Sequence, residues 1–325
     1  MRIWIKNPLA VLAGDTGGGI VVEDHVIAEC LSPGGNPASA VDEIFDASEH
    51  VVLPGLINTH HHFYQTLTRA YGPALDKELF DWLKTLYPVW AGLTPEFLDV
   101  ASRLALAELL LSGCTTAADH HYVFPDGLED AVDIQAAAAQ EMGVWVTLTR
   151  GSMNLSVEDG GLPPRSVVQD ADVILADSAR VIDACHDPSP GAMIQIALAP
   201  CSPFSVTREI MMDTAALAAD NGVGLHTHLA ETENENAFCV EMFGCRPLDY
   251  LEQVGWLNTG CGWPMASILH PMKLPGSARQ APVLHIVRGR TCCSRLDCVL
   301  RSNWRHRERR SASGSMDRRR KMPPI

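Results

Sequence analysis

One segment of the sequence joins an apolar strand directly to a histidine cluster: Leu56-Ile57-Asn58-Thr59-His60-His61-His62. Its apolar start predicts a short buried strand, and the Pro54-Gly55 pair before it indicates a turn. Side chains alternate between the two faces of an extended segment, so we expect His60 and His62 to point the same way and His61 elsewhere. Two imidazoles with this spacing can bind one metal ion. A surface cluster of polar side chains is the alternative.

A second segment of the same kind is Leu225-His226-Thr227-His228-Leu229-Ala230-Glu231, again at the end of an expected strand. A histidine followed three positions later by a glutamate can supply a metal ligand and a nearby proton shuttle. A metal lowers the pKa of bound water towards neutrality, and a carboxylate can then carry the proton to a leaving group. Neutral imidazoles suit zinc or ferrous iron and disfavour magnesium or calcium.

Apolar strands and helices alternate through the region that contains both segments. The expected strands are residues 56–58, 115–118, 144–149, 193–199 and 223–228, and the expected helices are 95–112, 129–142, 167–186, 207–220 and 235–254. Such alternation predicts an α/β fold with a parallel sheet covered by helices. Polar residues follow the strand ends, which favours a partial TIM-type (β/α) barrel of about five βα units with its site at that face. A doubly wound sheet has the same alternation.

Residues 1–54 are expected to form short strands instead. A hairpin pattern joins residues 20–22 to residues 26–28, and residues 51–53 form another apolar strand. We expect this part to be a separate domain that ends where the barrel begins.

Composition places the chain among globular proteins. Its 325 residues are 46% hydrophobic and 20% charged, which allows one large domain or two ordinary ones. No apolar run reaches the roughly 18 residues of a membrane span, and the N-terminus lacks a signal-peptide pattern. Ten cysteines are too few for a disulfide scaffold, so we expect a cytoplasmic location.

The two histidine segments, with the Pro-Gly turn, resemble the amidohydrolase superfamily in its nucleobase and triazine deaminase branch. Four further segments are similar to members of that branch that act on 8-oxoguanine: residues 63–69, 119–122, 150–153 with 160–164, and 200–204. The resemblance covers about residues 1–257. It implies a barrel flanked by a β-sandwich, to which residues 1–54 contribute the N-terminal part.

The resemblance implies hydrolytic deamination of an amino-substituted heterocycle, with 8-oxoguanine converted to urate and ammonia. A triazine or N-substituted amidine hydrolase is the alternative within the branch. His60, His62 and His228 would hold one divalent metal ion, zinc or else iron. Glu231 would deliver a proton to the departing ammonia. Gln65 would contact the purine ring or anchor its own loop.

Other polar residues at strand ends are expected to be structural as readily as substrate-binding; these are His120, His121 and Arg150. Three cysteines are expected to pack as small apolar groups, namely Cys114, Cys185 and Cys201. The expected partner is a small purine or related heterocycle. A membrane partner is not expected, and a homo-oligomer is left open.

The net charge of −14 is an average over two unlike parts. Residues 258–325 hold 14 basic and 3 acidic side chains, a net charge of +11, whereas the first 257 residues carry −25. Strand and helix periodicity also ends after Leu257, and arginine runs at 305–310 and 318–321 have no apolar face. We therefore expect an irregular basic tail. A nucleic-acid-binding arm is the alternative, because clustered arginines attract phosphates.

The superfamily also has a histidine after the sixth strand, in a Leu-Ala-His-Gly pattern, and an aspartate after the eighth, in Val-Asp-Gly-Ser. Neither motif follows Leu257. The genetic code suggests a reason. Read two bases later, the codons of Trp263-Pro264-Met265-Ala266 permit Ala-His-Gly, and those of Gly314-Ser315-Met316-Asp317-Arg318-Arg319 permit Val-Asp-Gly-Ser-Ala.

We therefore expect a frameshift near residues 258–262. The expected domains are residues 1–54 (part of a β-sandwich), 55–257 (an incomplete hydrolase barrel) and 258–325 (a non-native tail). A barrel without its last strands exposes sheet edges, so poor folding and little activity are expected for the literal chain. The alternative from a different functional class is an inactive truncated protein whose basic tail binds nucleic acid without specificity.

Overall fold

The structure, a computed structural model, describes residues 1–12 and 16–257, and the backbone of residues 266–269. The chain divides into two compact units, of which the first contains residues 1–54 and the second begins at Gly55. The expected frameshift point and almost all of the expected irregular tail lie outside the described residues. The part of the tail that is described is one short strand, β12 (Ala266–Leu269).

The first unit contains a four-stranded sheet in the order β4-β3-β1-β5. Its strands are β1 (Arg2–Lys6), β3 (Gly19–Glu23), β4 (Val26–Leu31) and β5 (Glu43–Asp46). The antiparallel pairing of β3 with β4 confirms the predicted hairpin. A second, two-stranded sheet pairs β2 (Ala10–Val11) with β6 (Val51–Val52). The small core of this unit contains Trp4, Val21 and Leu31.

The second unit is built on a six-stranded parallel sheet in the order β12-β11-β10-β9-β8-β7. The other strands are β7 (Leu56–His61), β8 (Cys114–Asp119), β9 (Trp145–Ser152), β10 (Ile194–Pro200) and β11 (Gly224–His228). Each strand lies beside the next one in the chain. In a doubly wound sheet, the order of the strands along the sheet reverses at a switch point. The sequential order therefore agrees with the winding of a (β/α) barrel.

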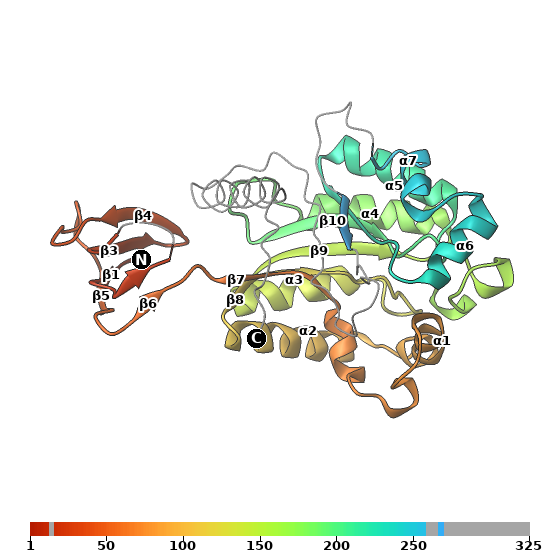
Figure 1. The fold of residues 1–325 in the computed structure, drawn as a ribbon, viewed down its shortest axis with the longest axis horizontal. Helices are drawn as coiled ribbons and strands as arrows, with labels where there is room; N and C mark the ends of the chain where they lie inside the picture. The colour runs from red at the N-terminus through yellow and green to blue at the C-terminus, as the bar shows by residue number, and fades with distance from the viewer. Residues whose placement is uncertain (13–15, 258–265, 270–325) are drawn as a thin grey trace, which may run out of the picture. The chain divides into compact units, whose positions relative to one another are not determined.

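Helices follow the strands and cover the sheet, as α2 and α3 do along β8 and β9 in Figure 1. The predicted helices are present as α2 (Pro95–Leu111), α3 (Ala131–Met142), α4 (Ala171–Cys185) and α5 (Arg208–Asn221). Thr94 caps α2 as expected, since its side chain accepts from the Phe97 amide.

Two helix predictions are corrected by the structure. The helix expected over 167–186 begins only at Ala171, because residues 165–167 form the 3-10 turn η4 (Arg165–Val167). The helix expected over 235–254 is two helices, α6 (Glu233–Phe243) and α7 (Pro247–Gln253). Gly244 ends α6 in a left-handed conformation with φ of 70°, and Pro247 begins the next helix.

One helix was not predicted, α1 (Leu79–Trp90), which contains Pro88. It follows the 3-10 turns η1 (Phe63–Thr68) and η2 (Gly72–Ala74), and a further turn, η3 (Val157–Asp159), follows β9. No helix among the described residues combines the length and apolar character needed to cross a membrane.

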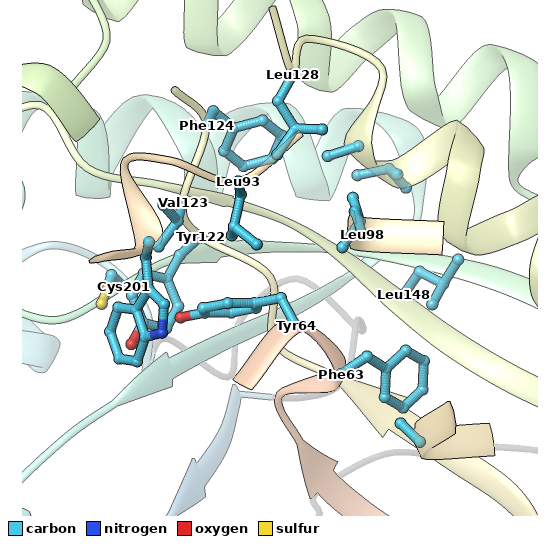
Figure 2. Packing of buried hydrophobic residues seen from close by; sticks show 14 of the residues in the cluster. Phe63, Tyr64, Leu93, Leu98, Tyr122, Val123, Phe124, Leu128, Leu148 and Cys201 are labelled. Carbon is cyan, nitrogen blue, oxygen red and sulfur yellow. The ribbon is translucent and has the colours of Figure 1, made fainter. Parts of the chain in front are cut away.

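The main core lies between the sheet and its helices. Figure 2 shows Tyr64 with its hydroxyl on the Tyr122 and Cys201 side of this cluster, whereas Phe63 points away from them. Close packing of β7 on β8 begins at Gly55, where a Cβ would come within 2.1 Å of the Thr115 hydroxyl. Glycine is therefore required where the first barrel strand starts.

Candidate metal centre

The ends of β7 and β11 bring three of the predicted residues together. His60 lies on β7, His62 directly follows that strand, and His228 is the last residue of β11. One ring nitrogen from each residue lies within 4.8 Å of the others. The structure thus brings together the three side chains that the resemblance implies as metal ligands.

Each of these imidazoles has its Nδ1 atom engaged. Nδ1 of His62 lies 2.6 Å from the His120 carbonyl oxygen, and Nδ1 of His228 lies 2.8 Å from the Cys201 carbonyl oxygen. Nδ1 of His60 lies 3.1 Å from Nε2 of His226. A carbonyl accepts only from a protonated nitrogen, so the first two rings keep Nε2 as a free lone pair. This arrangement fixes the tautomer that a metal needs.

The remaining geometry fits a tetrahedral ion. The Nε2 atoms of His62 and His228 are 3.2 Å apart. Two nitrogen ligands of one tetrahedral zinc ion are about 3.3 Å apart. Burial holds the pKa of His60, His62 and His228 below the usual histidine value, so all three rings are neutral. Neutral buried imidazoles are the donors that zinc or iron prefers.

A second group of three histidines shares one member with the first: His60, His120 and His226. His120 and His226 are buried, and Nδ1 of His120 has no hydrogen-bond partner among the described residues. An ion in this group would need Nδ1 of His60, because that atom faces His226. Both groups could hold ions together only if His60 lost both ring protons. We therefore favour one ion on the first group, with His226 as the hydrogen-bond partner of His60.

The first group opens into a pocket of about 250 Å³. The pocket also receives Glu231, which lies three residues beyond His228 at the same end of the sheet. The remaining lining residues are Gln65, Leu79, Trp82, Leu83, Tyr122, Cys201 and Phe204. Mostly apolar and aromatic lining with a few polar groups, here one carboxylate and one amide beside the histidines, is typical of a site for a small molecule.

Gln65 reaches this pocket from η1. Its side-chain nitrogen donates to the hydroxyl of Tyr64 at 3.2 Å and lies 3.5 Å from the hydroxyl of Tyr122. Figure 2 shows the two tyrosines on the same side of the core. Both predictions for Gln65, a ligand contact and a loop anchor, agree with this position.

Other predicted polar residues are buried away from the pocket. Arg150 donates to Asp177 at 2.6 Å and to Gln169 at 2.9 Å, and its guanidinium lies 3.9 Å from the Phe124 ring centroid. His121 is fully buried, and burial lowers its pKa to about 3. The ring of His121 packs against the rings of Tyr64 and Phe124. Both Arg150 and His121 thus contact residues of the core and do not line the pocket.

The three cysteines singled out in the sequence are free thiols. Cys114 and Cys201 are buried, and Cys185 is half-buried. Burial raises the pKa of Cys201 to about 12, so this thiol stays protonated beside the pocket. Packing as small apolar groups agrees with the position of all three.

Two buried carboxylates support the site and were not predicted. Asp119 accepts from the Phe63 amide and from the Gln135 side chain, both at 2.6 Å. Glu235 accepts from the backbone amides of Ala230 and Glu231, in the turn before α6. Burial raises the pKa of each carboxyl to about 7, against the lowering effect of these hydrogen bonds. For Glu235 a sequence signal existed, the Thr-x-x-Glu capping pattern over residues 232–235.

Comparisons with known proteins agree with this architecture. The family model of the amidohydrolase family matches residues 51–314. An 8-oxoguanine deaminase from Pseudomonas aeruginosa is 61% identical over 260 residues, which are 79% of this chain and 58% of the relative. A hydroxydechloroatrazine ethylaminohydrolase from Pseudomonas sp. strain ADP is 35% identical over 81% of this chain and 56% of its own length.

A solved structure, the atrazine chlorohydrolase of Arthrobacter aurescens complexed with zinc, has a TM-score of 0.71 at 28% identity. The match covers 78% of this chain and 58% of that one. The chain thus spans somewhat more than half the length of the relatives it matches. Since the family model covers most of its residues, the chain belongs to the amidohydrolase family.

Proposed function

We propose that the site serves hydrolytic deamination of an amino-substituted heterocycle, with 8-oxoguanine converted to urate and ammonia. The observation that supports this most directly is the common pocket of His60, His62, His228 and Glu231. Three neutral imidazoles beside one carboxylate provide the ligands and the proton carrier that hydrolysis of an amidine requires.

The residues of this chain divide the work. His60, His62 and His228 would hold one divalent ion, for which we propose zinc; when bound, it would lower the pKa of water and so provide a hydroxide nucleophile at neutral pH. Water adds to the ring carbon that carries the amine. One proton of this water goes to the adjacent ring nitrogen, and Glu231 carries the other to the amine nitrogen. The carbon–nitrogen bond then breaks, ammonia leaves and the carbon becomes a carbonyl. Gln65 would face the ring from η1, together with the aromatic side chains that line the pocket.

The choice of substrate rests on the relatives. The 61% identical relative is named for 8-oxoguanine, whereas the hydroxydechloroatrazine ethylaminohydrolase and the atrazine chlorohydrolase are 35% and 28% identical. A triazine or N-substituted amidine hydrolase is the alternative. The two differ in the ring that Gln65 and Trp82 would face.

We also propose a frameshift and a cytoplasmic location, with a nucleic-acid-binding tail as the alternative to the frameshift. A frameshift near residues 258–262 would explain why the sixth-strand histidine and eighth-strand aspartate patterns are missing from the sequence. A reducing, cytoplasmic location agrees with the six free thiols among the described residues. The basic tail as a nucleic-acid arm would be supported only by a salt-dependent shift on DNA or RNA that is lost on truncation after Leu257.

The test compares the literal chain with a version whose reading frame is restored from residue 258. Each is loaded with zinc, and ammonia release is measured from 8-oxoguanine and from an amino-substituted triazine. We expect turnover of 8-oxoguanine by the restored chain and little or none by the literal chain. Glu231→Gln in the restored chain should lower kcat by roughly 100- to 10,000-fold while zinc binding is kept.

Each arm has a contradicting outcome. No ammonia from either heterocycle in the restored chain would overturn the proposed function, and preference for the triazine would replace the proposed substrate. Equal turnover by the two chains would overturn the frameshift. Resequencing the coding DNA checks the frame independently of activity.

A further inference from the structure

The turn that carries Glu231 has an unfavourable backbone conformation. Residues 229–232 connect β11 to α6, and within them Ala230 has a φ of 55°. This left-handed region is disfavoured for a residue with a Cβ and persists only where surrounding contacts enforce it. The direction in which Glu231 leaves the strand therefore depends on whatever holds this turn.

The side chain of Glu235 makes those contacts. One carboxylate oxygen accepts from the Ala230 amide at 2.8 Å, and the other accepts from the Glu231 amide at 2.7 Å. The amide of Glu235 in turn lies 3.4 Å from the hydroxyl of Thr232, the N-cap of α6. Both oxygens are thus used on two consecutive amides, one of which belongs to Glu231 itself.

This carboxylate is buried without a cation. Glu235 has no exposed surface, and none of the ion pairs formed by the described residues includes it. A buried carboxylate is costly unless donors satisfy it. An ordinary capping box satisfies one amide, at the N-cap residue. The contacts of Glu235 instead reach back to the turn ahead of the cap.

We propose that Glu235 is a positioning residue for Glu231. Its carboxylate holds the amides of Ala230 and Glu231, maintains the left-handed turn and so keeps the side chain of Glu231 in the pocket beside His228. This inference rests on the proposed function only in giving Glu231 the proton transfer; the clamp itself is a property of the backbone.

The test measures amide hydrogen exchange in the full chain with Glu235→Ala and Glu235→Gln. Loss of both acceptors should speed exchange at Ala230 and Glu231 by about tenfold or more, while residues 225–228 of β11 change by less than about twofold. Glutamine offers one carbonyl oxygen, so Glu235→Gln should keep only one of the two amides protected. A residue needed only for overall stability would speed exchange throughout the sheet.

The matched control is Glu233→Ala, two residues earlier on the same helix. Glu233 is exposed and accepts from the Asn236 side chain at 3.4 Å, so its loss should leave both amides unchanged. Zinc affinity, measured by chelator competition, should stay within about twofold in every variant because Glu235 contacts no histidine of the metal group.

The outcomes separate the clamp from the proposed function. Unchanged exchange at Ala230 and Glu231 in Glu235→Ala would overturn the clamp even if ammonia is released normally. Faster exchange at these two amides would support the clamp even if no heterocycle is deaminated. An equal increase in the Glu233→Ala control would also overturn it.

Discussion

The two strand ends that carry the metal group are supported in different ways. After β7, the Phe63 amide donates to Asp119, which lies 56 residues further along the chain on β8. After β11, the amides of Ala230 and Glu231 donate to Glu235, only a few residues further on. One carboxylate arrives through the fold of the sheet, and the other through a local turn.

This difference has a consequence for how the site forms. The backbone after His62 reaches its place only once β7 and β8 have paired, because Asp119 is part of β8. The turn that presents Glu231 can form within the segment that contains it. We therefore expect damage to the β7 end to reduce both folding and metal binding, and damage to the β11 turn to remain local.

We expect the largest effect from the loss of a proposed metal ligand, because the ion would be bound by residues from the ends of both β7 and β11. His62→Ala deletes one of the three proposed nitrogen ligands, so zinc affinity should fall by more than the roughly 100-fold that loss of a supporting hydrogen bond can cost. Chelator competition measures it. His61→Ala is the matched control, since its ring contacts Phe63 and does not belong to the metal group. Equal losses in the two variants would rule out this metal group.

The next largest effect is expected at Asp119, the carboxylate that the fold of the sheet brings to the end of β7. Asp119→Ala leaves the Phe63 amide and the Gln135 side chain without their acceptor inside the core. The free energy of unfolding should fall by about 2–5 kcal/mol. Urea unfolding of the metal-free chain measures this loss, with the exposed Asp126→Ala as control. A loss no larger than that of Glu235→Ala would contradict the contrast between the two ends.

The same contrast explains what the sequence could predict. Alternating apolar strands and helix caps such as Thr94 are local signals, and they placed five strands and most helices close to their observed bounds. The metal group could be predicted because each histidine pattern lies within one short segment. Asp119 could not be assigned, because its role depends on a partner 56 residues away. The break between α6 and α7 has local signals, Gly244 and Pro247, although a single helix was expected over 235–254.

The hydrogen bonds that orient the imidazoles of the metal group could not be predicted from the sequence either. His62 and His228 are oriented by the backbone carbonyls of His120 and Cys201, and a carbonyl carries no residue identity. His226 lay in a predicted motif, yet its contact with His60 joins strands that are 166 residues apart. Such contacts follow only from the order of strands in the sheet.

A smaller expected effect is the dependence of stability on pH that Glu235, the local support of the β11 turn, should cause. The pKa of Glu235 is about 7 in the folded chain, above its usual value near 4.5, because burial disfavours the charged form. The folded state then binds a proton that the unfolded state has released, so stability falls as the pH rises from about 4.5 to 7. The decrease should be up to about 3 kcal/mol.

Glu235→Gln should lack this decrease. Urea unfolding of both chains at pH 5 and pH 8 gives the difference, in which the similar contribution of Asp119 cancels. A difference between the two chains that stays constant from pH 5 to pH 8 would mean that folding does not raise the pKa of Glu235.

The smallest effect concerns the cap that places Glu235. Thr232→Ala removes the hydroxyl that accepts from the Glu235 amide, which should cost about 1 kcal/mol of stability. Thr94→Ala, at the equivalent position of α2, should cost a similar amount. Only Thr232→Ala should also speed amide exchange at Ala230 and Glu231, because only that cap orients the carboxylate that holds them. Equal exchange in the two variants would show that Glu235 keeps the turn without help from its cap.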